Sequence, residues 1–294
     1  MLCAGSGPVN HDCRGFSLTE NECFAMNGAT NKTRRREAMG GLAKGLEVIR
    51  AFTHDSPSLT LSEIASRAGL PPATARRCLL TLAECGYVMQ LGRDFLLRPK
   101  VLELGAAYLD SMNIEVLTRT YLEDLASQTG DSSALTVLDR NDIVYVARAS
   151  ARTLMRLEAH VGSRFPAYPT SMGRVLLAGL SPQRLEKYLA EAEITPLTER
   201  TVTDRVKLRS LIEECRRVGY SAVEDELAYG VVAVAVPVFD KARRVVAALN
   251  SSSHSKKMTR AKLVKERVPL LQKVSAQISR ELHRVPGLSL SAQI

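Results

Sequence analysis

The sequence has no tryptophan, only 5% aromatic residues and only five histidines in 294 residues. It contains no run approaching the roughly 18 apolar residues that a membrane-spanning helix requires. Its N-terminus lacks the basic region and apolar core of a secretory signal. These absences predict a cytoplasmic protein that has no membrane partner.

The six cysteines include no C-x-x-C pair and have no histidine at metal-ligand spacing. Cys3, Cys13 and Cys23 lie in a Gly/Ser/Asn-rich leader, whereas Cys78 and Cys85 lie in a helical pattern. Unpaired thiols are the expected state in a reducing cytosol. We therefore expect no disulfide, no metal site and no cofactor.

The sequence also lacks a G-x-S-x-G elbow, an H-E-x-x-H pair, a P-loop and a G-x-G-x-x-G turn. The segment from Ser253 to Lys256 matches the bare S-x-x-K pattern, but it is polar and has no companion motif, so chance explains it. We predict that the chain is not an enzyme. A metabolic enzyme and an architectural DNA-binding protein without a ligand are the alternative hypotheses.

Positive charge is in excess: 40 Lys and Arg against 31 Asp and Glu give a net charge of +9. This balance favours a polyanionic partner such as nucleic acid, although it is weak evidence alone. The basic residues of the segment 256–265 lie far from the motif described next and are interpreted as a solvated helix face. The length allows two domains, each with its own core.

Three short helices are predicted near the N-terminus. Thr60 and Glu63 have capping-box spacing, and Gly69 suits the end of this second helix. Pro72 opens the third helix, which stops at Gly86. The first helix is indicated by apolar residues expected to form one packed face: Leu42, Leu46, Ile49 and Phe52.

A hairpin is indicated after the third helix by the runs YVMQ and FLLR, which are joined by LGRD. Two helices with a glycine-bearing turn followed by a hairpin predict a winged helix-turn-helix. The third helix would pack its Ala and Leu residues inward and turn polar residues toward the major groove of DNA. The candidate DNA contacts, including one at the wing tip, are Thr74, Arg76, Arg77, Thr81 and Arg93. Solvated charges on an amphipathic helix are the alternative.

From about Asn113 onward, helical patterns alternate irregularly with β-rich runs such as SALTVLD, DIVYVARAS, VVAVAVPVF and RVVAALNSS. Hairpins mixed with helices, without strict βαβ alternation, predict an α+β sheet domain. A long final helix is expected to kink at Pro269.

Two segments resemble the isocitrate lyase regulator (IclR) family of bacterial transcription factors: LTLSEIASRAGLPPATARRCLLTLAECGYV and GYSAVEDELAYGVVAVAVPVFD. The resemblance runs from about Lys44 to Pro286. Val223 departs from the general signature. Together with RFPAYPTSMGRVLLAG, it is similar to the subgroup that regulates protocatechuate, 4-hydroxybenzoate and β-ketoadipate catabolism. The signature positions are Gly219, Glu226, Ala233, Ala235, Phe239 and Asp240.

The resemblance implies a GAF-like effector domain, an inverted-repeat operator in double-stranded DNA and a homodimer or dimer of dimers. RNA polymerase is a further candidate partner, and the effector would be a small carboxylate or an aromatic acid. The expected fold class is α/β (α+β). The expected organisation is a disordered leader (1–38), a winged helix-turn-helix (39–98), a linker helix (99–112), a GAF-like domain (113–286) and a tail (287–294). The start of translation could also be Met26 or Met39.

The resemblance also implies the effector site. Ser171 and Met172 would offer backbone N–H groups, although Thr170 and Ser171 could simply cap a helix. Arg148 and Arg156 are candidate counter-ions, with surface salt bridges as the alternative. The remaining candidates are Glu224, where some members have Asp, Ala233, where some have Cys, Asn250 and Ser252. Glu224 could instead belong to a solvated acidic turn, and Asn250 and Ser252 could simply end a strand.

Overall fold

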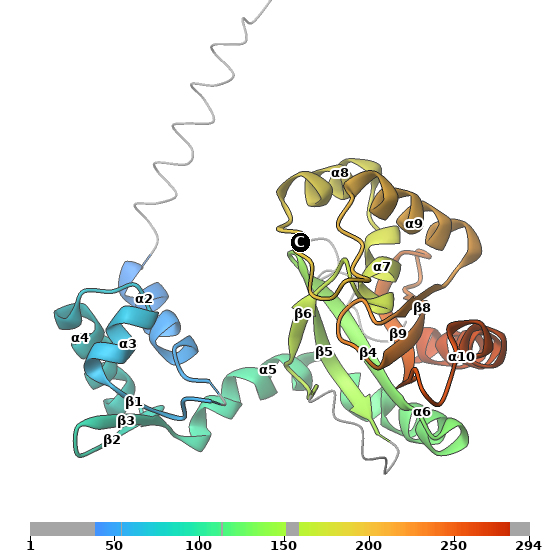
Figure 1. The fold of residues 1–294 in the computed structure, drawn as a ribbon. Coiled ribbons are helices and arrows are strands. Elements are labelled where there is room, and N and C mark those ends of the chain that lie inside the picture. Colours follow the sequence, from blue (N-terminus) through green and yellow to red (C-terminus); the bar gives the residue numbers. More distant parts are fainter. Residues whose placement is uncertain (1–38, 54, 113, 151–158, 283–294) are drawn as a thin grey trace, which may run out of the picture. The chain divides into compact units, whose positions relative to one another are not determined.

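The computed structural model describes residues 39–53, 55–112, 114–150 and 159–282 (Figure 1). The predicted leader, the tail 287–294 and Arg156 lie outside these residues. The chain divides into two compact units, residues 1–101 and 102–294. No helix in the described part combines the length and the apolar character needed to cross a membrane.

The N-terminal unit is a winged helix-turn-helix. Its three-stranded antiparallel sheet has the order β1-β3-β2. β1 was missed by sequence analysis, because three residues are too few for an apolar alternation; its pairing with β3 holds it in place. The elements are α2 (Gly40–Arg50), β1 (Ser58–Thr60), α3 (Leu61–Arg67), α4 (Pro72–Glu84), β2 (Val88–Leu91), β3 (Asp94–Leu97) and a 3-10 turn, η1 (Pro99–Val101).

The predicted start of α3 is confirmed. The backbone N–H of Thr60 donates to the carboxylate of Glu63 (2.8 Å), and the N–H of Glu63 donates to the Thr60 hydroxyl (3.4 Å). This reciprocal box satisfies two backbone groups that a helix N-terminus leaves free. Gly69 follows the helix with φ +61°, a backbone conformation that glycine adopts without steric cost.

The predicted apolar face of α2 is wrong in part. Val48, not the predicted set, is the buried residue of this helix, while Leu42 and Leu46 are 63% and 46% exposed. The reason is that α2 contributes Val48 and the following Ala51 to the small core shared with Ile64 and Leu79. This core covers only one side of the helix, so the leucines remain uncovered in a single chain.

The C-terminal unit is built on a six-stranded sheet in the order β6-β5-β4-β9-β8-β7, in which every neighbouring pair is antiparallel. The strands are β4 (Ser132–Asp139), β5 (Asp142–Ala149), β6 (Arg164–Pro166), β7 (Ser221–Glu224), β8 (Val231–Phe239) and β9 (Val245–His254). The helices are α5 (Leu102–Met112), α6 (Ile114–Thr129), α7 (Ser171–Ala178), α8 (Pro182–Glu191), α9 (Arg205–Val218) and α10 (Arg260–Leu282). The fold class predicted from the sequence is confirmed.

Helices cover both faces of this sheet (Figure 1). α6 and α10 pack on one face, where Leu122, Val234 and Leu271 share a core. α7 and α9 lie on the other face, where Val175, Ala235 and Ile212 share a second core. α10 continues through Pro269. The pocket described below opens on the face that carries α7.

Candidate functional site

The outward surface of α4 is the first candidate site. Ala75 and Leu79 are buried against the core, which turns Arg76, Arg77 and Thr81 toward solvent. Thr74 is half-buried. Thr81 donates its hydroxyl to the backbone oxygen of Arg77 (3.1 Å), so its remaining lone pairs are available as acceptors.

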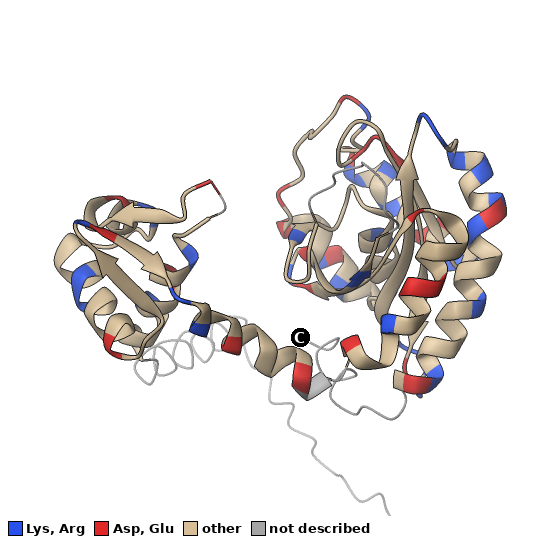
Figure 2. Ribbon diagram, turned by 90° about the horizontal axis from the view of Figure 1, so that it is seen from below, with Lys and Arg blue, Asp and Glu red and all other residues tan. Residues whose placement is uncertain are grey.

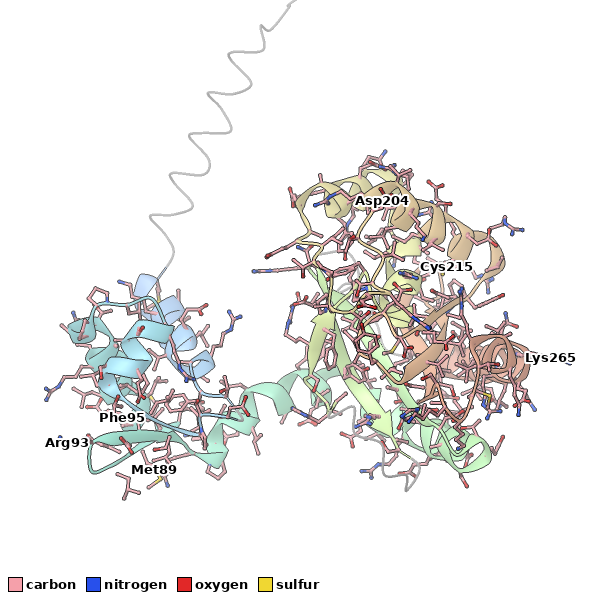
Figure 3. The ribbon with its side chains drawn as sticks, viewed as in Figure 1. Met89, Arg93, Phe95, Asp204, Cys215 and Lys265 are labelled. Carbon is pink, nitrogen blue, oxygen red and sulfur yellow. The ribbon has the colours of Figure 1, made fainter. Side chains whose placement is uncertain are left out.

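Across the described residues, neither Arg76 nor Arg77 lies in an ion pair with a carboxylate. Arg93 is exposed beside Gly92 at the tip of the β2–β3 hairpin (Figure 3), and Phe95 anchors the same hairpin in the core. Guanidinium groups held outward at these places suit phosphates and guanine edges.

Basic residues occur on many elements of both units (Figure 2). In the segment 256–265, the lysines and Arg260 are exposed, and Lys262 lies 3.9 Å from Glu266. The structure therefore agrees with a solvated helix face for Arg260, Lys262 and Lys265 of α10, whereas Lys256 and Lys257 lie in the turn that precedes this helix.

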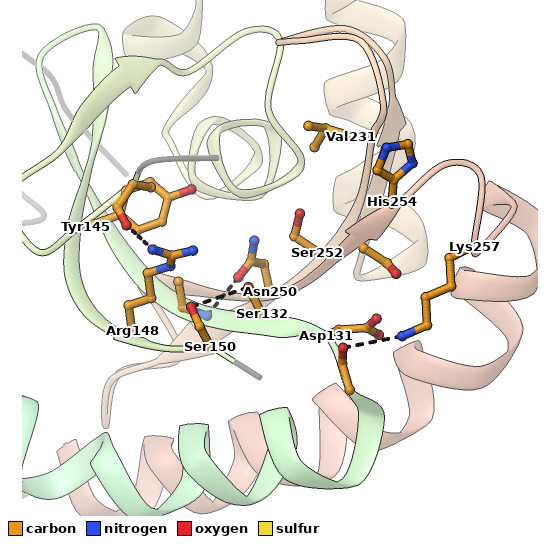
Figure 4. Close-up of a pocket in the computed structure, with 14 residues that line it drawn as sticks. Asp131, Ser132, Tyr145, Arg148, Ser150, Val231, Asn250, Ser252, His254 and Lys257 are labelled. Carbon is orange, nitrogen blue, oxygen red and sulfur yellow. Dashed lines mark hydrogen bonds between the residues drawn. The ribbon is translucent and has the colours of Figure 1, made fainter. Parts of the chain in front are cut away.

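A pocket on the α7 side of the large sheet is the second candidate site (Figure 4). Residues directly opposite each other in antiparallel strands share a face. The register aligns Ala235, Asn250, Ala134 and Arg148 in one row across four strands. The next row contains Ala233, Ser252 and Ser132. The polar side chains that line the pocket include Tyr145, Arg148, Asn250, Ser252, His254 and Lys257.

The amide of Asn250 has a fixed orientation. Its Oδ1 accepts a hydrogen bond from the backbone N–H of Ala134 (2.8 Å), and that group can only donate. The Nδ2 group is therefore left as a donor on the pocket side (Figure 4). Arg148, in the same row, donates to the backbone oxygen of Ala159 and is half-buried. Two hydrogen-bond donors, one of them charged, thus converge on the pocket.

Tyr145 forms an aromatic wall of the pocket. Its ring meets that of Phe165 edge-on, with centroids 5.8 Å apart. Burial raises the pKa of the Tyr145 phenol to about 12, although the neighbouring Arg148 cation opposes the shift. The hydroxyl is therefore neutral at physiological pH.

The opposite end of the pocket carries His254 and Lys257. The Nδ1 atom of His254 accepts from the backbone N–H of Lys256 (3.0 Å), so the neutral ring carries its proton on Nε2. Gly230 lies against this ring: a Cβ there would come within 3.2 Å of it. Lys257 donates to the backbone oxygen of Gly130 (3.4 Å).

A buried carboxylate lies at the same end. The side chain of Asp131 is inaccessible to solvent, and its Oδ2 accepts from Arg267 (2.8 Å) and from Ser251 (3.1 Å). Asp131 is thus paired with Arg267, and Lys257, which forms no ion pair with another described residue, brings a further positive charge to this end. No cluster of His, Cys, Asp or Glu suited to a metal ion is found among the described residues.

Of the effector residues proposed from the sequence, the structure brings Arg148, Asn250 and Ser252 together in this pocket. Ala233 is paired with Ser252 in the sheet but does not line the pocket. Glu224 pairs with Val232, which packs on the α10 side, and its carboxylate lies 3.9 Å from Arg200.

Ser171 and Met172 form the first turn of α7 and are buried, but they do not line the pocket. Thr170 caps this helix by accepting from the N–H of Gly173 (2.9 Å). The hydroxyl of Ser171 has no hydrogen-bond partner within the part of the chain described. Sequence analysis did not identify Tyr145, His254 or Lys257 as pocket residues, because the strand register places Tyr145 and His254, and Lys257 lies in the turn that follows β9.

Comparison with known proteins gives two family matches: the IclR helix-turn-helix domain over residues 41–92 and the bacterial transcriptional regulator IclR C-terminal domain over residues 106–280. The Pca regulon regulatory protein of Pseudomonas putida is 39% identical over 245 residues, which cover 83% of this chain and 84% of that protein. The p-hydroxybenzoate hydroxylase transcriptional activator of Acinetobacter baylyi is 30% identical over 255 residues, covering 85% and 94%.

A crystal structure of a candidate transcriptional regulator from Rhodococcus sp. RHA1 superposes with a TM-score of 0.75 at 40% identity, covering 84% of this chain and all of that one. The relatives named here are regulators of transcription, in agreement with the expectation that the chain is not an enzyme. Their names also agree with the subgroup that the sequence resembles. The chain therefore belongs to the IclR family of bacterial transcriptional regulators, with a winged helix-turn-helix followed by the family's C-terminal effector domain.

Proposed function

We propose that this regulator controls genes of aromatic-acid catabolism, in the protocatechuate, 4-hydroxybenzoate and β-ketoadipate pathways, and responds to a small carboxylate bound in the pocket. The observation that carries the proposal is the convergence of Arg148 and the Asn250 Nδ2 group on one pocket of the effector domain. Two relatives whose names refer to the Pca regulon and to p-hydroxybenzoate hydroxylase support the pathway.

The chemistry of the pocket fits an aromatic acid. Arg148 and Asn250 supply donors for a carboxylate, and charge-assisted hydrogen bonds are the stronger kind. The Tyr145 ring offers an apolar surface on which an aromatic ring can pack. At the other end, Ser252 and the Nε2–H of His254 can bind a second polar group, such as a ring hydroxyl.

The proposed DNA contacts are those of α4 and the wing: Thr74, Arg76, Arg77, Thr81 and Arg93. Because its target is chromosomal DNA, the cytoplasm is the proposed site of action. The proposed operator is an inverted repeat, since a dimer with two-fold symmetry presents two reading helices to two half-sites.

Uncovered apolar surface supports a homodimer. Leu42 and Leu46 of α2 are exposed, as are Leu102, Leu104 and Tyr108 of α5. Each Å² of apolar surface removed from water contributes about 25 cal/mol, so a dimer in which a second copy covers these helices would be stabilised. We propose this dimer, and its pairing into a dimer of dimers, as the DNA-binding form. RNA polymerase is a further proposed partner.

The proposed mechanism is a shift between two placements of the paired DNA-binding units, transmitted through α5. A ligand shifts such an equilibrium only by its differential affinity for the two placements, typically about 1–3 kcal/mol. An architectural protein would lack this coupling, and an enzyme would convert the acid without DNA.

A thermal-shift screen of hydroxybenzoates, protocatechuate and aliphatic dicarboxylates, followed by calorimetry, tests the effector class. A ligand selective for the native state raises the melting temperature. We expect at least one of these acids to bind wild-type protein and to lose affinity in Arg148→Met. Arg217→Met, which removes an exposed arginine from α9, is the matched control. Equal binding to all three proteins would refute the proposed site.

A further inference from the structure

Leu80 lies in the middle of the surface that α4 turns away from its core. Its side chain is 50% exposed, whereas the adjacent Leu79 is fully buried. A single exposed leucine is common on protein surfaces and alone means little. The position of Leu80 is informative, because the neighbouring exposed side chains of α4 suit contacts with DNA.

Helical periodicity places Leu80 one turn after Arg76 and Arg77, on the same ridge of α4. Side chains on an α-helix lean toward its N-terminus. The isobutyl group of Leu80 therefore leans toward the two arginines, and Thr81 follows it in the chain. The result is an apolar group on the same exposed surface of α4 as two arginines and a threonine.

The major groove has a matching feature. Arginine and threonine can bind base edges by hydrogen bonds, but leucine cannot. The apolar group that a base pair presents in this groove is the C5-methyl group of thymine. An exposed leucine on the same surface as the arginines thus fits a thymine near a base or phosphate that the arginines contact.

We propose that Leu80 contacts the C5-methyl group of one thymine in each operator half-site and makes that position selective for thymine; this inference rests on the DNA contacts proposed above for α4. One turn of α-helix spans about 5.4 Å, and base pairs are about 3.4 Å apart along the duplex. The thymine therefore lies about one or two base pairs from the base or phosphate that Arg77 contacts. The alternative is that Leu80 contacts a second protein molecule and not DNA.

The test removes the Leu80 side chain and the thymine C5-methyl group separately. A high-affinity duplex is first selected from random sequences with the full-length protein, and each of its thymines is then replaced by deoxyuridine, which lacks only the C5-methyl group. Binding to wild type, Leu80→Ala and Leu197→Ala is measured by fluorescence anisotropy. Leu197 is 43% exposed in the C-terminal unit and provides the matched control. Leucine and alanine both favour helix, so α4 is retained in the variant.

At one thymine per half-site, we expect deoxyuridine to weaken wild-type binding about fourfold, as for the loss of one buried methyl group. Leu80→Ala should weaken binding to the unmodified duplex by at least as much and be insensitive to deoxyuridine at that position. Leu197→Ala should behave as wild type.

Two results would overturn the proposal. The first is that no thymine replacement is coupled to Leu80, so that every deoxyuridine effect persists in Leu80→Ala. The second is that Leu80→Ala lowers the melting temperature or changes the oligomeric state in the absence of DNA, which would assign the side chain to a protein contact.

Discussion

The guanidinium of Arg174 and the carboxylate of Glu226 form an ion pair of 2.5 Å whose side chains are 3% and 10% exposed. Arg174 belongs to α7, and Glu226 follows β7. Arg174 also donates to the backbone oxygen of Tyr168 (3.0 Å), and Glu226 accepts from the N–H of Val202 (3.3 Å). The pair thus joins α7, which packs on the pocket face of the sheet, to two loops distant in sequence.

Removing one partner of this pair leaves a buried charge without compensation. We expect Glu226→Gln to lower the free energy of unfolding by about 3–5 kcal/mol, as measured by urea denaturation. The control is Glu214→Gln, which breaks the exposed pair with Arg217 and should leave stability unchanged. Equal free energies of unfolding for the two variants would show that the buried ion pair does not stabilise the fold.

Arg148→Met should weaken binding of 4-hydroxybenzoate by about 1.5–3 kcal/mol, roughly 10- to 150-fold in Kd, because a hydrogen bond to a charged group is lost. Calorimetry with 4-hydroxybenzamide provides the control, since the amide carries no charge. Its Kd should be similar in both proteins. If both ligands lose affinity equally, Arg148 supports the pocket structurally and does not bind the carboxylate.

Arg77→Ala should weaken operator binding by about 1–3 kcal/mol and relax selectivity at one base position, as expected for a guanine contact. Arg93→Ala should instead weaken binding to all sequences alike and lower the salt slope by about one, as expected for a phosphate contact. Competition assays over a set of single-base operator variants measure both. A uniform loss in Arg77→Ala would reassign that residue to the phosphate backbone.

Tyr145 makes stability sensitive to alkaline pH. Because its pKa rises from 10.0 to about 12 on folding, its contribution is fully present below pH 10 and is lost as the pH rises through 12. The wild type should lose about 1 kcal/mol more than Tyr145→Phe between pH 9 and pH 11 in urea unfolding. Parallel pH profiles for the two proteins would contradict the assigned burial of this phenol.

Local signals in the sequence predicted most of the DNA-binding unit. The capping box of Thr60 and Glu63, Pro72 and Gly86 fixed the helix bounds because each acts on its own neighbours. The apolar face of α2 was misjudged, because periodicity identifies apolar residues but not which of them a partner element covers. Leu42 and Leu46 are uncovered for this reason.

The pocket was only partly predictable. Arg148 and Asn250 lie about a hundred residues apart in sequence and meet because β4 pairs with both β5 and β9. That register depends on long-range pairing, which no local pattern encodes. It also places Glu224 beside Val232, on the strand positions that face α10. The short strand β6 was missed because its three residues are ordered by pairing with β5.

The most direct test of the account is the operator affinity of the full-length protein with and without a saturating acid that calorimetry has shown to bind. The account predicts a 5- to 150-fold change in Kd, equivalent to a coupling of about 1–3 kcal/mol, which disappears in Arg148→Met. Equal operator affinities with the acid bound and absent would contradict it.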